Sequence, residues 1–431
     1  MKFVVTGPLA DKNLGDYAMF INNIYDLGKS YDYSIFHYSG DFVSMLKADY
    51  LEDYNCNFTE VKFRQSFYEK PSILNRIVRK LFRSVGIKIA HDSKIPTPFE
   101  ILNNIDNLST IESEVINSDA LIVSGGGYLN KLWFEWARKD DLFKILAPIY
   151  LAKRHNKKIY FTANGYGPFD ESEKFFTDFF GFISDAHLGV RDHVLSKTYL
   201  KGLGVSDANI INIPDDLFII NEEIIEKANN VSKCPEHNYI VLEFYYSLEW
   251  VKENLKTIQS FIDYIWNNYN FKVIYIPFDH TPVAGFLESQ ITNENFEVYK
   301  IGDYLKIEDA ITIISNAKAV LCNRYHALVL SLQNQVPVVN IMKEVYDYRY
   351  YYNKNLGVLT NIFAEIDFDE NLFLKLDPTE TLSWFSKNLE AVINQQSDLY
   401  KSEKFVKNHI ALRKERKDYL NFIQSKSNQF C

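Results

Sequence analysis

Short apolar runs alternate along the chain with longer amphipathic stretches. This alternation is typical of strands and helices that follow one another in a parallel α/β sheet. In the first half the apolar runs predict six strands, at residues 2–6, 33–38, 120–124, 158–162, 187–190 and 210–213. Almost every run is followed by a Gly, Asn or Asp turn and then by a helical stretch. We therefore expect a doubly wound α/β domain in this half.

The segment 221–237 interrupts this pattern, because it is polar and contains the turn-forming pairs Asn229-Asn230 and Cys234-Pro235. After it the pattern predicts a helix over about 248–269 and five more strands, at residues 239–244, 272–276, 296–299, 319–322 and 336–341. From about residue 380 to the end the pattern is helical.

These boundaries predict two Rossmann-like domains, residues 1–225 and 236–380, with terminal helices at 381–431 that pack across their junction. Doubly wound domains bind ligands at the carboxyl ends of their strands. The expected fold class is therefore α/β, with two doubly wound domains facing a cleft in the GT-B-like manner.

Length, charge and cysteine spacing exclude some classes of function. A chain of 431 residues is too long for one ordinary core, which agrees with two domains. The net charge is −9, so nothing indicates a nucleic-acid partner. The cysteines lie far apart without metal-ligand spacing, so no metal is expected; they are Cys56, Cys234, Cys322 and Cys431.

The N-terminus starts a strand at once and has no apolar signal-peptide region. No run of 18 apolar residues exists that would span a membrane. We therefore expect a cytoplasmic protein.

One basic segment has the composition of a helix that binds a membrane surface. Between Lys70 and Lys88 there are six Lys or Arg residues and no Asp or Glu, with apolar residues at helical spacing. A basic amphipathic helix can lie on the anionic inner face of a membrane. An ordinary helix with its apolar face in the core has the same pattern and is the more common case.

Polar and glycine-rich motifs follow several predicted strands. The first is Asn13-Leu14-Gly15-Asp16, where Gly15 permits a ligand to approach the backbone and Asp16 can cap the next helix. The second is Ser124-Gly125-Gly126-Gly127, whose glycines leave backbone amides open to an anion or a sugar. Helix capping alone would explain Asp16, and a tight turn would explain the three glycines.

A third motif, Asn164-Gly165-Tyr166-Gly167-Pro168-Phe169, again follows a predicted strand. Close after it, Arg191 ends another strand. Its planar guanidinium suits a carboxylate or a phosphate, because it donates two parallel hydrogen bonds. The alternative is an ion pair between Arg191 and Asp192 on the surface.

The fourth motif, Asn323-Arg324-Tyr325-His326-Ala327, lies at a predicted strand-to-helix junction. A helix N-terminus already favours anions, and Arg324 adds a positive charge. His326 can give or take a proton near neutral pH. A lone histidine is usually structural. A histidine close to an arginine at a strand-to-helix junction is a better candidate for a catalytic role.

In this order the motifs, with Pro214-Asp215-Asp216 between Arg191 and Arg324, resemble the polysaccharide pyruvyl transferase family. The resemblance runs over about residues 1–360. The chain departs from the family pattern at Asn164 and at the tandem aspartates. The resemblance implies phosphoenolpyruvate as the donor, a saccharide acceptor that is lipid-linked in many such pathways, and no cofactor. It also implies a role in building surface polysaccharide.

The resemblance assigns catalysis to Arg191, Arg324 and His326: the two arginines hold the donor phosphate and carboxylate, and His326 protonates C3 or takes the acceptor proton. Substrate contacts are expected from Asn13, Gly15, Asp16, Gly125, Gly126, Gly127, Asn164, Gly165, Tyr325 and Asp215. Asp279 is a spare carboxylate that can orient sugar hydroxyls. Two other functions stay open, a nucleotide-sugar glycosyltransferase of GT-B type and a non-catalytic saccharide-binding protein.

Overall fold

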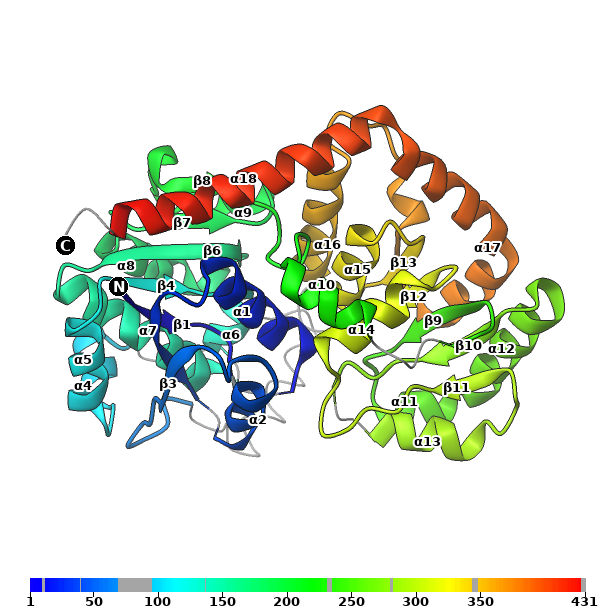
Figure 1. The fold of residues 1–431 in the computed structure, drawn as a ribbon, viewed down its shortest axis with the longest axis horizontal. Helices are drawn as coiled ribbons and strands as arrows, with labels where there is room; N and C mark the ends of the chain where they lie inside the picture. The colour runs from blue at the N-terminus through cyan, green and yellow to red at the C-terminus, as the bar shows by residue number, and fades with distance from the viewer. Residues whose placement is uncertain are drawn as a thin grey trace, which may run out of the picture.

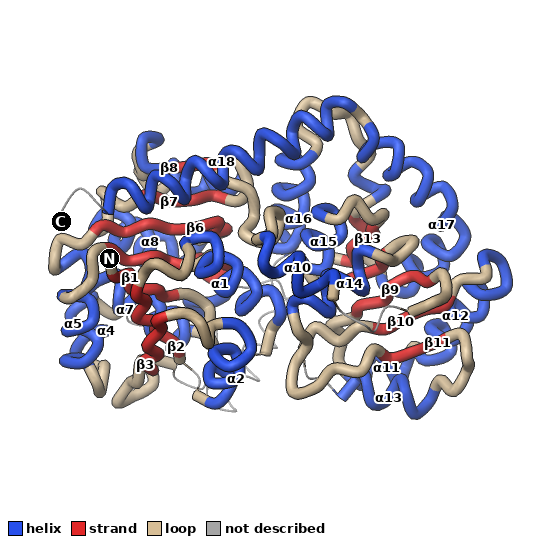
Figure 2. Tube along the Cα trace, viewed as in Figure 1, coloured by secondary structure: helices blue, strands red, loops and turns tan. Residues whose placement is uncertain are grey.

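The computed structural model describes residues 1–9, 12–38, 40–68, 95–135, 137–230, 235–279, 282–342 and 348–427. Two parallel sheets lie side by side, each with helices on both faces (Figure 1). Coloured by element type, the strands form the centre of each half and the helices form the outside (Figure 2). The basic segment 70–88 falls outside the described residues.

The N-terminal sheet is parallel and has the strand order β3-β2-β1-β4-β6-β7-β8, with β5 paired to β6. Its strands are β1 (Lys2–Thr6), β2 (Asp32–His37), β3 (Asn55–Glu60), β4 (Ala120–Val123), β5 (Gly126–Leu129), β6 (Lys158–Tyr166), β7 (His187–Val190) and β8 (Ile210–Asn212). This is the Rossmann order, and it reverses direction between β1 and β4. Thr6 pairs with Val123, so the segments that follow these two strands begin next to each other.

The C-terminal sheet repeats this arrangement with the order β11-β10-β9-β12-β13-β14, again parallel. Its strands are β9 (Tyr239–Glu243), β10 (Lys272–Tyr275), β11 (Phe296–Val298), β12 (Val320–Cys322), β13 (Val338–Ile341) and β14 (Leu374–Lys375). Glu243 pairs with Cys322 at the point where the order reverses. Glu243 therefore lies beside the turn that carries Arg324.

Helices cover both sheets and link them. Those of the N-terminal half are α1 (Leu14–Leu27), α2 (Asp41–Tyr50), α4 (Pro98–Asn103), α5 (Leu108–Ile116), α6 (Lys131–Glu135), α7 (Lys139–Arg154), α8 (Glu173–Phe182), α9 (Leu195–Gly202) and α10 (Glu222–Asn229). Those of the C-terminal half are α11 (Leu248–Glu253), α12 (Leu255–Tyr269), α13 (Pro282–Gln290), α14 (Ile307–Ser315), α15 (Tyr325–Gln333), α16 (Tyr348–Ile362), α17 (Pro378–Lys401) and α18 (Glu403–Ser427).

The buried apolar side chains form three clusters. One cluster joins the N-terminal sheet to α4, α5, α7 and α8. A second cluster joins the C-terminal sheet to α11, α12, α13 and α17. The third is continuous between the two halves and includes Ile24 of α1, Leu328 of α15 and Ile423 of α18. Apolar packing therefore joins the two sheets, and α18 takes part in it.

The long terminal helices connect the halves. Helix α17 packs on α12 of the C-terminal half, whereas α18 runs back along the N-terminal half and contacts α1 (Figure 1). The linking segment holds α10, which packs against α14. Arg416 of α18 pairs with Asp26 and Asp216 of the N-terminal half.

The apolar periodicity predicted eleven strands, and all of them are confirmed, with ends that differ by at most four residues. Three strands were missed: β3 and β5 are polar or glycine-rich, and β14 has two residues. The single helix expected over 248–269 was wrong. It is two helices, α11 and α12, divided at Asn254, whose side-chain amide donates to the carbonyl of Trp250.

Candidate active site

The ends of strands from both sheets meet at the first turns of α1 and α15. Asn13 precedes α1, and its side-chain oxygen accepts a hydrogen bond of 3.1 Å from a terminal nitrogen of Arg324, the residue that precedes α15. The backbone N–H of Leu14 donates to the carbonyl of Phe278, which follows β10. Two helix N-termini thus converge at the junction of the halves, and each favours negative charge.

His326 lies against Gly15 at this junction. A Cβ atom on Gly15 would stand 1.6 Å from Nδ1 of His326, so only glycine leaves room for the imidazole. His326 is 8% exposed, and its Nε2 atom has no hydrogen-bond partner among the described residues. Burial, followed by the charges of Lys354, Arg191 and Arg324, lowers the pKa of His326 well below its usual value. The imidazole is therefore held in its neutral form at pH 7.

Arg324 is held from several sides. Its guanidinium pairs with Asp279, which follows β10, and lies 3.9 Å from the ring centre of Tyr245, which follows β9. Its Nε atom is 3.7 Å from the carboxylate of Glu243. The same carboxylate accepts the backbone N–H groups of Asn323 at 3.1 Å and Arg324 at 2.8 Å. Glu243 therefore fixes the turn that presents Arg324.

Arg191 comes from the N-terminal sheet and is 2% exposed. Its Nη1 atom donates to Asp215 at 3.1 Å, and the same carboxylate oxygen accepts the hydroxyl of Tyr325 at 3.2 Å. The guanidinium carbon lies 4.5 Å from the centre of the Tyr325 ring. Gly165 leaves room for this arrangement, because a Cβ atom there would be 3.1 Å from Arg191. Arg191, Asp215, Gly165 and Tyr325 thus meet as one group.

The alternative of a surface ion pair between Arg191 and Asp192 is wrong. The carboxylate of Asp192 is buried and accepts the backbone N–H groups of Leu195 and Ser196, each at 2.7 Å, at the start of α9. Burial raises the pKa of Asp192. Asp192 therefore holds the turn after β7, and Arg191 is left to face Asp215 and Tyr325.

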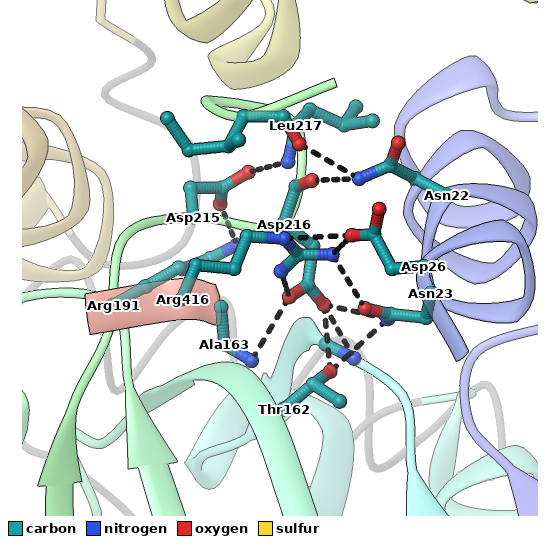
Figure 3. A network of polar contacts seen from close by, with 12 residues as sticks. Asn22, Asn23, Asp26, Thr162, Ala163, Arg191, Asp215, Asp216, Leu217 and Arg416 are labelled. Atoms are coloured by element: carbon teal, nitrogen blue, oxygen red, sulfur yellow. Dashed lines mark hydrogen bonds and ion pairs between the residues drawn. The ribbon is translucent and has the colours of Figure 1, made fainter. Parts of the chain in front are cut away.

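The adjacent residues Asp215 and Asp216 have different partners (Figure 3). Asp216 accepts hydrogen bonds from Asn23, Thr162 and Arg416 at 2.8, 2.6 and 2.6 Å. It belongs to a buried network that ties α18 to α1 and β6, whereas Asp215 faces Arg191. The tandem thus combines one aspartate at the candidate site with one in the structural network.

The first residue of the triple glycine, Gly125, also belongs to this network. The Gly125 amide donates to Asp216 at 3.2 Å, and a Cβ atom at Gly125 would stand 2.3 Å from that carboxylate. Gly126 and Gly127 start β5, which pairs with β6. The expectation that the Gly125 amide faces the ligand was wrong, because the neighbouring carboxylate already occupies it.

Asn164 and Asp16 come from two of the motifs and make local hydrogen bonds. The Asn164 side chain is buried and donates to the Thr162 carbonyl, and its Oδ1 atom has no hydrogen-bond partner among the described residues. Asp16 lies in the first turn of α1, and its carboxylate accepts the side-chain amide of Asn13, the residue that precedes the helix, at 2.7 Å.

Two residues of the site and one of the Asp216 network carried no sequence motif. Glu243 closes an apolar strand, and a charged residue in that position was the one available signal. Lys354 lies in α16, and its ammonium is 4.2 Å from the centre of the Tyr325 ring. Arg416 lies in a helix rich in lysine and arginine. Nothing in the sequence distinguishes Lys354 or Arg416 from surface cations.

Two classes of site are not formed by the described part of the chain. Within it, His, Cys, Asp and Glu side chains form no group of three or more that would hold a metal ion. None of the helices described there is long and apolar enough to span a membrane.

The fold is shared with sugar-nucleotide enzymes of GT-B type. UDP-GlcNAc 2-epimerase from Methanocaldococcus jannaschii is 15% identical, with 96% of this chain and 99% of that chain covered and a TM-score of 0.52. UDP-GlcNAc 2-epimerase from Neisseria meningitidis, solved with UDP-GlcNAc, is 11% identical, with 99% and 100% covered and a TM-score of 0.53. At such identities the likeness concerns the fold alone.

Among curated proteins, no sequence matches the chain significantly. The family model named polysaccharide pyruvyl transferase matches residues 13–342, which run from Asn13 at the start of α1 to the residue after β13. That span contains Arg191, Asp215, Arg324 and His326. The chain therefore belongs to the polysaccharide pyruvyl transferase family.

Proposed function

We propose that this protein transfers the pyruvyl group of phosphoenolpyruvate to two hydroxyls of a saccharide, forming a ketal during surface polysaccharide synthesis. Family membership supports the transferase class. The observation that carries the donor assignment is the convergence of Arg191, Arg324 and Lys354 with the N-termini of α1 and α15 around one neutral histidine. Phosphoenolpyruvate carries a carboxylate and a phosphate, and this arrangement supplies cationic groups for both.

The two arginines suit the two anionic groups of the donor. Each guanidinium has five N–H donors in a fixed planar fork. Asp215 takes one bond from Arg191, and Asp279 and Asn13 take two from Arg324. In this proposal the two guanidinium groups bind the phosphate and the carboxylate, and the paired carboxylates keep the guanidinium groups oriented.

Of the two roles left open for His326, the environment favours the acceptance of a proton. A buried neutral imidazole whose pKa is lowered is a poor acid at pH 7, but its Nε2 lone pair can take the proton of an attacking hydroxyl. We therefore assign His326 to the acceptor hydroxyl.

A thermal-shift titration tests the donor, because a ligand that binds only the folded state stabilises it by mass action. We expect phosphoenolpyruvate to raise the melting temperature and Arg324→Ala to abolish the increase. Inorganic phosphate and pyruvate, each tested alone, are the controls for the two halves of the donor.

UDP and GDP belong in the same titration, because the N. meningitidis structure of like fold was solved with UDP-GlcNAc. Stabilisation by a nucleoside diphosphate, with no response to phosphoenolpyruvate, would replace the proposal by a nucleotide-sugar enzyme. Stabilisation by saccharides alone, without turnover, would indicate a non-catalytic binding protein.

A further inference from the structure

Lys354 lies at the centre of the candidate site although no motif includes it. Its ammonium is 4.2 Å from the centre of the Tyr325 ring, and the Arg191 guanidinium is 4.5 Å from the same ring. Tyr325 directly precedes His326 in α15, and their rings are 5.0 Å apart. Lys354, Arg191 and His326 thus surround one tyrosine ring.

Contacts with both halves hold the helix that carries Lys354. The Asn361 amide donates to the Arg191 carbonyl at 2.6 Å, and the Asn355 amide donates to Asn340 of β13 at 2.8 Å. Gly357 lies directly against Asp192, where a Cβ atom would stand 2.5 Å from that side chain. Lys354 directly precedes the first of these anchors. Asn340, which accepts from Asn355, itself donates to the Arg324 carbonyl, so the helix start is tied to Arg324 as well as to Arg191.

The surroundings make Lys354 an unusual amine. Burial and the charge of Arg191 lower the pKa of Lys354 to about 7, opposed by the carboxylates of Asp16 and Asp215, with Arg324 adding a further lowering. An ordinary lysine has a pKa near 10.4 and is a weak proton donor at neutral pH. A pKa close to the working pH is the value at which a general acid is most effective.

We propose that the Lys354 ammonium donates the proton that C3 of the enolpyruvyl group receives, while His326 takes the proton of the acceptor hydroxyl. This assignment rests on the proposed function. It gives the site separate groups for the two opposite proton transfers, both placed against Tyr325. Arg191 and Arg324 remain the anion-binding groups.

The proton balance closes over one turnover. An N–H bond of Lys354 breaks as the C3–H bond forms, and the first saccharide oxygen bonds to C2 as its proton passes to His326. The second hydroxyl then bonds to C2 as the C2–O bond to phosphate breaks. Its proton returns to the Lys354 amine, and the proton on His326 leaves with the phosphate. Both side chains regain their starting states.

The test compares Lys354→Arg and Lys354→Gln with the wild type. Arginine keeps the positive charge but does not release a proton at neutral pH, so we expect phosphoenolpyruvate to bind within about threefold of wild type while kcat falls by about 10²–10⁴-fold. Lysine-to-arginine exchange at exposed Lys256 is the matched control. The glutamine variant, which lacks the charge, should lose both binding and turnover.

A pH profile supplies a second readout. We expect wild-type kcat/KM to fall above about pH 7, because the free enzyme then holds the neutral amine. The groups facing Lys354 are Arg191, Asp16, Asp215, Arg324 and His326. The pKa of His326 lies well below its usual value, so His326 does not produce a fall in rate above pH 7. His326→Gln should therefore keep the alkaline limb, and Lys354→Arg should lose it.

Retention of kcat within tenfold in Lys354→Arg would overturn the assignment of Lys354 and leave the proposed function intact. A wild-type protein that neither binds nor turns over phosphoenolpyruvate would overturn the proposed function and this assignment together.

Discussion

Single atoms decide which residues form the candidate site. Gly15 admits the His326 ring because it lacks a Cβ atom, and Gly165 leaves space for the Arg191 guanidinium. The two adjacent aspartates differ in their partners, since Asp215 pairs with Arg191 and Asp216 pairs with Arg416. At this scale position in space, rather than residue type, separates a site residue from a structural one.

Gly15→Ala should reduce activity by at least about tenfold, because displacement of a reacting group by about 1 Å can cost 10²-fold. The added methyl group would overlap Nδ1 of His326, so the ring must move. Steady-state kinetics with phosphoenolpyruvate measures the effect. Gly181→Ala in α8 is the control, because a Cβ atom there meets nothing within 4 Å. Unchanged kcat in Gly15→Ala would show that the imidazole position is not critical.

His193 should make the stability depend on pH. Burial lowers the pKa of His193 to about 4, whereas an unfolded histidine has a pKa of about 6.5. The unfolded state therefore binds a proton first, and the free energy of unfolding falls as the pH drops from about 6.5 toward 4. Urea denaturation at pH 7 and pH 5 should show a loss that His193→Gln reduces by about 1–2 kcal/mol. The same substitution at exposed His237 is the control, and equal losses in both variants would contradict the prediction.

Whole elements orient the site through buried polar contacts. Helix α16 connects Arg191 to Asn340, and α18 brings Arg416 to Asp26 and Asp216 (Figure 3). The Asp216 network also binds the Gly125 amide and Thr162 of β6. Neither helix carries a family motif, yet both fix the ends of the strands that do.

Arg416→Met should lower the free energy of unfolding by about 3–5 kcal/mol, because Asp26 and Asp216 would stay buried without their cation. Urea denaturation measures the change. Arg413→Met, three residues earlier on the exposed side of α18, should change it by less than about 0.5 kcal/mol. A similar small effect in both variants would mean that water replaces the guanidinium.

The whole molecule is held together by the apolar cluster between the sheets. It includes side chains of β1, β9, α1, α15 and α18, so neither half closes its core alone. The terminal helix contributes five buried side chains, namely Phe405, Leu412, Tyr419, Leu420 and Ile423.

Truncation after Ser402 should therefore prevent stable folding of the N-terminal half. Five lost side chains at about 1.5–3 kcal/mol each amount to the same order as the stability of a typical domain. Soluble yield and dye binding to exposed apolar surface measure the outcome. Truncation after Ser427, which keeps all of α18, is the control. A soluble, cooperatively folded protein ending at Ser402 would contradict the prediction.

The sequence by itself determined the element order and the residues of the motifs. Apolar periodicity marks the buried strands because a parallel sheet needs apolar residues on both faces. The order of the motifs was enough for the resemblance to the family, which the family model confirms. Polar or very short strands such as β3 and β14 gave no such signal.

Only the tertiary structure decided which residues meet. Lys354 and Arg416 look alike as cations in polar helices, and folding brings the first to Tyr325 and the second to Asp216. The role of Gly125 and the neutral state of His326 likewise depend on neighbours distant in sequence. The physical reason is that burial and charge act through space, and the local pattern of a chain records neither.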